Sequence, residues 1–180
     1  MKIVTATEQL IPRVSDLANE CSFEKLSQKE RQERGFLFPY SADEYSVFVR
    51  SAVHFYVSEE EDEIRGFLLA HSSDQIEQFG GDIYLHIKRT EKEKFIAVRQ
   101  VCTRFQYRGQ GYAKKLYDHL FKAVEKDPAN PRLAIGFIWR TPPNPSSERF
   151  HQKLGFRLIG THSCRYPFGD GEVGIWARTI

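Results

Sequence analysis

Apolar and polar residues follow one another along this chain in two periods, one typical of helices and one typical of strands. Residues 2–6 are predicted as a strand, and residues 7–21 as a helix with an apolar stripe that begins behind Thr7. A polar segment, residues 24–34, leads to a second helix behind Ser41, a residue type that caps helix N-termini. The inward-facing positions of that helix are Tyr45, Phe48 and Val49.

The next stretch predicts two strands, residues 54–57 and 64–70, joined as a hairpin around the acidic run 59–63. We expect this run to be a solvated turn, because it lacks the Asx and glycine pattern of a calcium-binding loop. The connection 72–94 is longer than a hairpin needs, and residues 83–87 within it are predicted as a short strand. Long loops in compact domains are often functional, so this connection is a candidate wall of a substrate site.

Residues 95–124 predict a strand, a glycine turn and a helix, and the rest of the chain is arranged around them. Residues 95–103 form an apolar run broken only by Arg99 and Gln100, and residues 113–124 carry apolar side chains at helical spacing. A glycine turn before a helix directs unpaired N–H groups and the positive end of the helix dipole at one spot. This spot suits a phosphate or pyrophosphate, although an ordinary tight strand-to-helix turn would look the same.

The last third of the chain predicts a strand, a helix and two final strands. Asn144 and Pro145 form a strong N-cap and first-turn pair for the helix around Phe150. The predicted strands are residues 133–139, 156–164 and 172–177, the last two flanking a turn at 167–171. The sequence contains no repeat and no linker, so we expect one domain, residues 1–180, with a mixed α/β order of elements.

Composition and charge exclude several classes of partner. The 180 residues are 41% hydrophobic, include 14 phenylalanines and carry a net charge of +2, with the basic residues scattered. This argues against a nucleic acid or a membrane surface as partner. The three cysteines, Cys21, Cys102 and Cys164, are odd in number and far apart, which is typical of reduced thiols in a cytoplasmic protein. The N-terminus lacks the long apolar segment of a secretion signal, so we expect a cytoplasmic location.

The glycine turn matches neither of the two common nucleotide-binding patterns. The P-loop lysine and hydroxyl are missing, and the dinucleotide fingerprint has Lys114 where its third glycine belongs. The spacing that fits is Gln106-x-x-Gly109-x-Gly111-x-Ala113. It resembles the Q/R-x-x-G-x-G/A pyrophosphate motif of the GNAT family of acetyl-CoA-dependent N-acetyltransferases.

A second segment, after the glycine turn, strengthens this resemblance. Asn144-x-x-Ser147-x-x-Phe150-His151-x-Lys153-Leu154-Gly155-Phe156 is similar to the family's N-x-x-A-x-x-(F)-Y-x-K-x-G-F segment. Two motifs in the right order are more specific than either alone. The resemblance implies a mixed, mostly antiparallel sheet of about six or seven strands flanked by helices.

The resemblance also implies a function and a set of site residues. The protein is expected to move an acetyl group from acetyl-CoA directly to an acceptor amine, with no metal. The strand end would pair with the pantetheine arm, the turn would hold the pyrophosphate, and the helix after Asn144 would flank the arm. The implied cofactor-binding residues are Val101, Cys102, Thr103, Arg108, Gly109, Gln110, Gly111, Tyr112, Ala113, Asn144, Ser147 and Phe150.

Catalysis is the least determined part of this interpretation. His151 stands where the family has a tyrosine acid, and with an ordinary pKa of about 6.5 it would protonate the leaving thiolate; it would equally suit a solvent-facing helix position. The central strand carries no carboxylate, so the sequence does not identify a general base. The other side chains considered are Glu93, Glu172, Asp82, His71, His86 and Tyr84. Cys102 has no readable His–Asp partner and is interpreted as a buried thiol.

The acceptor and the need for turnover stay open at this stage. A small-molecule amine is favoured over a protein N-terminus or lysine, because no peptide channel or acidic groove is readable. The histidine at 151 and the missing glutamate also suit an acyl-CoA-binding or sensory module without turnover. A homodimer is kept open, and a nucleoside-triphosphate-binding protein is the least favoured alternative.

Overall fold

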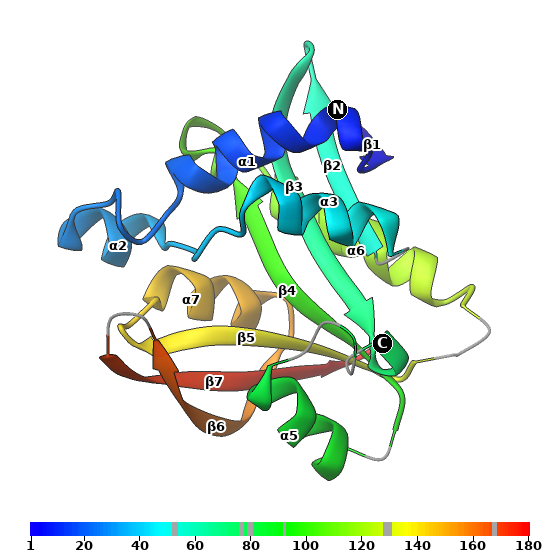
Figure 1. The fold of residues 1–180 in the computed structure, drawn as a ribbon, viewed down its shortest axis with the longest axis vertical. Helices are drawn as coiled ribbons and strands as arrows, with labels where there is room; N and C mark the ends of the chain where they lie inside the picture. Colours follow the sequence, from blue (N-terminus) through cyan, green and yellow to red (C-terminus); the bar gives the residue numbers. More distant parts are fainter. Residues whose placement is uncertain (52–53, 76–77, 79–80, 92, 128–130, 167–168) are drawn as a thin grey trace. The chain divides into compact units, whose positions relative to one another are not determined.

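The computed structural model describes residues 1–51, 54–75, 78, 81–91, 93–127, 131–166 and 169–180. The strands are β1 (Lys2–Thr5), β2 (His54–Glu60), β3 (Glu63–Ser72), β4 (Phe95–Thr103), β5 (Leu133–Thr141), β6 (Arg157–Tyr166) and β7 (Gly169–Thr179) (Figure 1). The helices are α1 (Ile11–Glu20), α2 (Gln28–Arg34), α3 (Ala42–Arg50), α5 (Asp82–Thr90), α6 (Tyr112–Val124) and α7 (Pro145–Lys153).

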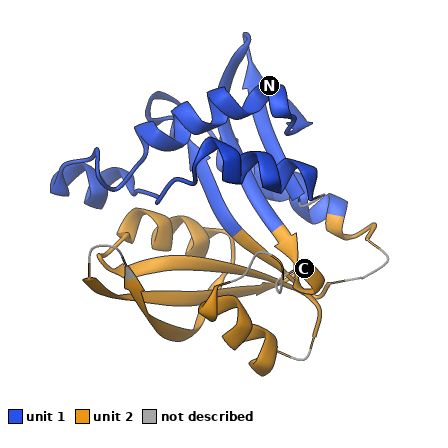
Figure 2. Cartoon of the chain, in the orientation of Figure 1, with its two compact units in different colours: residues 1–70, 99–123 blue, residues 71–98, 124–180 orange. Residues whose placement is uncertain are grey.

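The seven strands form one mixed sheet, as the family resemblance implied. Their order in the sheet is β1-β2-β3-β4-β5-β7-β6. The pair β4–β5 is parallel, whereas β1–β2, β2–β3, β5–β7 and β6–β7 are antiparallel. The chain divides into two compact units (Figure 2), unit 1 (residues 1–70 and 99–123) and unit 2 (residues 71–98 and 124–180). The predicted turn residues Pro167 and Phe168 lie outside the described residues, as do residues 128–130.

Unit 1 packs helices on both sides of its strands. Its helices α1 and α3 lie on one side, and α6 lies on the other (Figure 1). The apolar stripes predicted for these helices are buried, among them Val14, Tyr45 and Leu116. Ser41 caps α3 in a capping box, since its hydroxyl accepts from the Glu44 N–H (3.2 Å) and the Glu44 carboxylate accepts from the Ser41 N–H (2.8 Å). The apolar faces predicted for these three helices are therefore confirmed.

Two details of unit 1 differ from the prediction. Thr7 precedes a short 3-10 turn, Glu8–Leu10, and its side chain makes no capping hydrogen bond. The polar segment 24–34 contains a helix, α2, which buries none of its residues. Because α2 has no apolar stripe, the periodicity that reveals amphipathic helices is absent from it. Its signature is a capping box, in which Ser27 accepts from the Glu30 N–H and the Glu30 carboxylate accepts from the Ser27 N–H.

Unit 2 is built on a parallel ladder between β4 and β5, which pairs Phe95 with Leu133 and Val98 with Gly136. The helix α5 packs Tyr84 and Ile87 onto a core that includes Ile135 of β5. The helix α7 faces the neighbouring residue, Gly136, through the ring of His151. Because successive strand residues point to opposite faces, α5 and α7 lie on opposite faces of β5.

The prediction of a strand at residues 83–87 is wrong, because these residues belong to helix α5. The five residues Ile83-Tyr84-Leu85-His86-Ile87 look like a strand in isolation, since a short apolar run has no decisive period. In the structure Tyr84 and Ile87 are buried three positions apart, Gly81 is the N-cap, and Lys88 and Arg89 lie in the last turn. Basic residues at this position stabilise a helix, because their positive charges lie near the negative end of the helix dipole.

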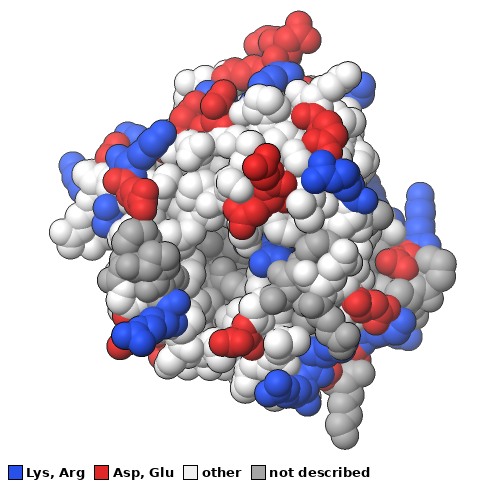
Figure 3. Space-filling view, in the orientation of Figure 1, with Lys and Arg blue, Asp and Glu red and all other residues white. Residues whose placement is uncertain are grey.

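Acidic and basic side chains lie interspersed in small groups on the face shown in Figure 3. Several charged side chains form exposed ion pairs, such as Arg50 with Glu8 (2.8 Å) and Lys114 with Asp118 (2.7 Å). Pairs of this kind add little to stability. None of the described helices combines the length and the apolar character that crossing a membrane requires.

Replacement of Gly66 by alanine should destabilise the protein by about 1–3 kcal/mol through overpacking. A methyl group at Gly66 on β3 would lie 2.7 Å from the backbone carbonyl oxygen of Cys102 on β4, closer than any real contact of this type. Urea unfolding followed by circular dichroism measures the change. Gly160→Ala is the control, since its methyl group would meet only Ile175 at 3.9 Å, and equal stability losses in the two variants would contradict the prediction.

Candidate functional site

The glycine turn has the backbone shape that a pyrophosphate cradle requires. Gly109 and Gly111 have φ angles of 77° and 86°, in the left-handed region that favours glycine. A Cβ atom at either position would find no heavy atom within 4 Å, so both residues border open space. The Gly111 carbonyl accepts from the Lys115 N–H at 3.0 Å, which places Gly111 directly before the first turn of α6. The N–H groups of that turn have no acceptor within the helix.

Two of the N–H groups predicted to hold a phosphate are instead used within the turn. The N–H of Arg108 donates to the Phe105 carbonyl (3.3 Å), and that of Gln110 donates to the Tyr107 carbonyl (3.4 Å). These two bonds fold the turn and bring its later residues into place. The cradle is therefore expected to rely on the N–H groups from Gly111 to Ala113, where the helix begins.

The side chain of Arg108 packs against residues at the end of β4 and at the start of the turn. Its Nε donates to the Thr103 carbonyl (3.0 Å), its guanidinium carbon is 4.4 Å from the centre of the Phe105 ring, and its Nη2 is 3.7 Å from the Cys21 sulfur. The predicted contact of Arg108 with a phosphate stays a prediction. In this arrangement the arginine fixes the end of β4 to the turn.

The end of β4 carries the three residues predicted to pair with the pantetheine arm. Cys102 and Thr103 are buried, and Val101 is half-buried. Among the described residues the Thr103 hydroxyl finds no hydrogen-bond partner although it is buried, which suits a polar ligand group. The hydrogen bond with the Cys21 thiol, together with burial, raises the pKa of Cys102 well above its ordinary value. Cys102 is therefore a protonated thiol at neutral pH, as expected for a packing residue.

The side chains that interrupt the apolar run of β4 are both engaged on the α3 side of unit 1. Gln100 donates to the Phe38 carbonyl (2.7 Å) and accepts from the Tyr45 hydroxyl (2.7 Å). Arg99 Nε donates to the Tyr40 hydroxyl (3.0 Å). Phe36, in the same segment before α3, is buried. These contacts fasten the segment before α3 to the central strand.

The predicted cap of α7 is confirmed. Asn144 is buried, and its side-chain oxygen accepts from the Ser147 N–H at 3.3 Å. Pro145 occupies the first position of the helix. Ser147 and Phe150 lie on the same helix as His151, and the ring of Phe150 is 5.2 Å from that of His151. The roles of Asn144, Ser147 and Phe150 toward the pantetheine arm stay predictions.

His151 is a buried residue with only 4% of its surface exposed, so the solvent-facing alternative is wrong. Its Nδ1 is 2.8 Å from the Ser147 carbonyl oxygen, which can only accept, so Nδ1 carries the proton. Burial lowers the pKa of His151 to about 4, and the bond to Ser147 offsets this only in part. The ordinary pKa on which its role as acid was argued therefore does not apply. At neutral pH the ring is uncharged, its Nε2 faces Gly136, and the acid role stays a prediction.

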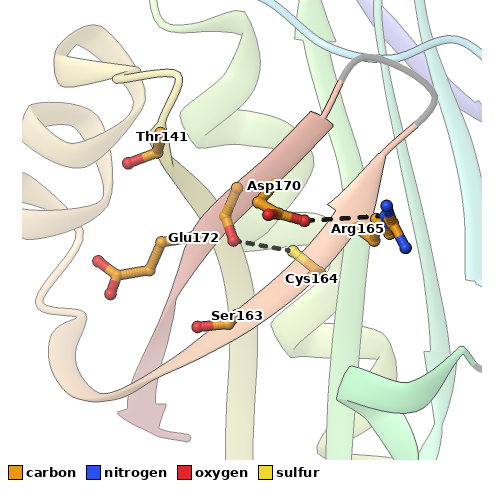
Figure 4. A pocket seen from close by; sticks show the side chains of 7 residues that line it. Thr141, Ser163, Cys164, Arg165, Asp170 and Glu172 are labelled. Atoms are coloured by element: carbon orange, nitrogen blue, oxygen red, sulfur yellow. Dashed lines mark hydrogen bonds and ion pairs between the residues drawn. The ribbon is translucent and has the colours of Figure 1, made fainter.

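A pocket of about 490 Å³ lies at one end of β5, β6 and β7 in unit 2 (Figure 4). Thr141, Glu172 and Ser163 stand side by side across these three strands, because Glu172 pairs in register with both of the others. Figure 4 shows the side chains of Glu172 and Ser163 pointing the same way. Arg140 Nε lies 3.1 Å from a Glu172 oxygen. Sequence reasoning missed this row because only the register of the two final strands brings it together.

The other side chains considered as general base also lie in unit 2. His71 and Tyr84 are buried, with their rings 5.4 Å apart, whereas Glu93, Asp82 and His86 are exposed. Among the described residues, no three His, Cys, Asp or Glu side chains are grouped to hold a metal ion. The predicted cofactor residues form two local groups: those from Val101 to Ala113 belong to unit 1, and those from Asn144 to Phe150 belong to unit 2.

Comparison with solved structures finds the same fold in several proteins. NAA60 of Arabidopsis thaliana, solved in complex with a bisubstrate analogue, has a TM-score of 0.72 at 12% identity, with 99% of this chain and 97% of that chain covered. The protein smu.2055 of Streptococcus mutans has a TM-score of 0.69 at 19% identity, with 99% of each chain covered. The putative acetyltransferase yncA of Salmonella typhimurium, solved with its cofactor acetyl-CoA, has a TM-score of 0.67 at 15% identity, with 99% and 93% covered.

The search of curated protein sequences finds no match. At the identities given above, the solved structures establish the fold alone. The family model of the acetyltransferase (GNAT) family, however, matches residues 11–156, well over half of the chain, and spans both the glycine turn and the helix behind Asn144. The protein therefore belongs to the GNAT family of acetyltransferases.

Proposed function

We propose that this protein transfers the acetyl group of acetyl-CoA directly to the amine of a small polar molecule. The observation that carries the proposal is the glycine turn, in which Gly109 and Gly111 adopt left-handed conformations and border open space directly before α6. This geometry suits a pyrophosphate, because bulk is absent where the ligand would lie and helix N–H groups converge there.

The residues at the end of β4 support the same ligand. The buried Thr103 hydroxyl has no partner among the described residues, so a polar group of the pantetheine arm would satisfy it. When bound, acetyl-CoA supplies an activated acyl carbon. The proposed contribution of unit 1 is to hold the donor through the glycine turn and the end of β4. Holding two reactants in place accounts for much of the rate gain in reactions of this kind.

The pocket of Figure 4 supports a small acceptor. Its volume of about 490 Å³ lies in the range of small-molecule sites. The Glu172 carboxylate between the hydroxyls of Thr141 and Ser163 offers hydrogen-bond acceptors to an amine. We propose that this row holds the amine, and that Glu172→Gln weakens use of the acceptor while leaving the affinity for CoA unchanged.

The test is a two-step measurement on the wild-type protein. Calorimetric titration with acetyl-CoA and with CoA comes first, and we expect saturable binding of both. Release of the CoA thiol is then followed with a thiol reagent against a panel of small polar amines and of peptides with free N-termini or lysines. Transfer to a small amine supports the proposal, and transfer only to peptides contradicts its acceptor class. The absence of binding by a well-folded protein contradicts the cofactor itself.

A second candidate function is an acyl-CoA-binding module without turnover. The observation that favours it is His151, which is buried and uncharged at the position of the family's acid. It predicts that CoA and acetyl-CoA bind while no amine in the panel increases thiol release. A rate that rises with amine concentration would contradict it.

A further inference from the structure

Arg65 is a buried arginine at the start of β3, with 7% of its surface exposed. Its Nη1 lies 2.6 Å from a Glu60 oxygen and donates to the Tyr112 hydroxyl at 2.9 Å. Its Nη2 donates to a Glu61 oxygen at 2.7 Å. Both terminal nitrogens are therefore occupied by groups of unit 1, and two carboxylates balance the charge.

The same guanidinium also contacts both ends of the glycine turn. Its central carbon lies 4.2 Å from the centre of the Tyr107 ring and 5.8 Å from that of the Tyr112 ring. Tyr107 precedes Gly109 by two residues, and Tyr112 follows Gly111 directly. One buried side chain thus touches the residue before the turn and the first residue of α6.

Glu63, two residues before Arg65, holds the beginning of the turn. Its carboxylate accepts from the Tyr107 hydroxyl and from Gln106 Nε2 (3.5 Å), and it lies 3.3 Å from Arg104 Nε. The backbone adds one more bond, from the Arg104 N–H to the Arg65 carbonyl at 2.9 Å. We call Glu60, Glu61, Glu63 and Arg65 the hairpin anchor. The acidic run predicted as a solvated turn therefore has a second role, because several of its carboxylates belong to this network.

The two glycines need such support because they have no side chains of their own. Glycine adopts many backbone conformations at similar energy, so the shape of the turn depends on the residues that flank it. Those residues are Tyr107 and Tyr112, and Arg65 contacts both. The Tyr112 hydroxyl also donates to Glu60 at 2.5 Å. This bond, followed by the one from the N-terminal amino group, lowers the pKa of Glu60 to about 2, so the carboxylate stays charged at neutral pH.

We propose that Arg65 is a positioning residue for the binding of coenzyme A. Through Tyr107 and Tyr112, Arg65 fixes the glycine turn in its binding shape without touching the ligand. The proposal rests on the function proposed above and extends it to a residue on another strand. Its energetic basis is preorganisation, since a turn that holds its bound shape in advance loses less entropy on binding. If removal of Arg65 lowers the fraction of competent turns to about a tenth, the apparent Kd for CoA rises about tenfold.

The test compares Arg65→Met, Arg65→Lys and Tyr112→Phe with the wild-type protein. Calorimetry gives the Kd for CoA, and hydrogen–deuterium exchange of the ligand-free protein gives the opening of residues 108–113. We expect Arg65→Met to raise the Kd about tenfold and to accelerate exchange in that segment. Tyr112→Phe, which removes one hydroxyl and leaves the buried charge paired, should show the same pattern to a smaller extent. Arg65→Lys should recover part of the affinity, because an ammonium can still pair with Glu60.

Arg13→Met is the matched control. Arg13 contacts Glu59 (3.3 Å) and the Asp62 carbonyl at the same end of the hairpin, and it belongs neither to the hairpin anchor nor to the turn. The Arg13→Met substitution should leave the Kd for CoA and the hydrogen–deuterium exchange of residues 108–113 unchanged. CoA binding by the wild type with unchanged affinity in Arg65→Met and Tyr112→Phe would overturn this inference alone. Faster exchange spread evenly over unit 1 would also overturn it, since it would show a general structural role. Failure of the wild type to bind CoA would overturn the proposed function as well.

Discussion

Replacement of Gly109 and Gly111 together by glutamate should raise the Kd for CoA at least about 100-fold, equivalent to roughly 3 kcal/mol. Each substitution places a carboxylate in the open space that borders the turn, where we propose the pyrophosphate to lie. Like charges a few ångströms apart repel by roughly 1–4 kcal/mol at water-like to surface-like dielectric constants. Both residues also have positive φ angles, so a side chain there strains the turn. Calorimetric titration measures the loss.

Two controls separate charge from strain in that experiment. The Gly109→Gln, Gly111→Gln variant carries nearly the same bulk and backbone strain without the charge, and it should lose clearly less affinity. Gly81→Glu adds a carboxylate at a glycine with ordinary φ that also borders open space, and it should bind CoA as the wild type does. Circular dichroism checks that each variant is folded. Wild-type affinity in a folded double glutamate variant would show that the turn does not hold the pyrophosphate.

The stability of the protein should fall as the pH is lowered from about 6.5 to about 4, because His151 resists protonation in the folded state. Its pKa is about 4 when folded, against about 6.5 when unfolded. Between these values the unfolded chain binds a proton that the folded chain does not, so acid favours unfolding. A difference of this size corresponds to roughly 3 kcal/mol, lost in full below pH 4. Urea unfolding at several pH values between 4 and 7.5 measures it.

His151→Asn is the comparison for this effect. An asparagine amide can still donate toward the Ser147 carbonyl but does not titrate, so the variant should start less stable and lose less stability on acidification. The gap between wild type and variant should therefore narrow as the pH falls. Parallel curves would contradict the assignment of this pH dependence to His151. A wild-type acetyl-transfer rate that falls as the pH rises through about 6.5 would show that a group other than His151 supplies the proton.

The strongest sequence predictions are those that depend on local chemistry. The glycine turn and the cap of α7 follow from residue types at fixed spacing. In the structure Gly109 and Gly111 form the turn, and Asn144 caps α7. The helices α1, α3 and α6 were readable because each has a long apolar stripe. The helix α2 lacks such a stripe, and only its capping box between Ser27 and Glu30 marks it.

What the sequence could not show depends on contacts between distant segments. Residues 83–87 were too short a run to distinguish a strand from a helix, and only the packing of Tyr84 and Ile87 on the core decides in favour of a helix. The burial of His151 depends on Gly136, a residue of another element that leaves room for the ring. The hairpin anchor joins residues 60–65 to residues 104–112, and no local pattern predicts that pairing.

The strand order β5-β7-β6 has a consequence for how the chain folds during synthesis. The last strand, β7, lies between two strands that precede it in the sequence, and it pairs with both. Until β7 leaves the ribosome, β5 and β6 each present an unpaired edge, and such edges are templates for association with other chains. Nascent chains that lack residues 169–180 are therefore expected to depend on chaperones and to aggregate when released early. Addition of β7 pairs the open edge of β5 and one edge of β6 at once.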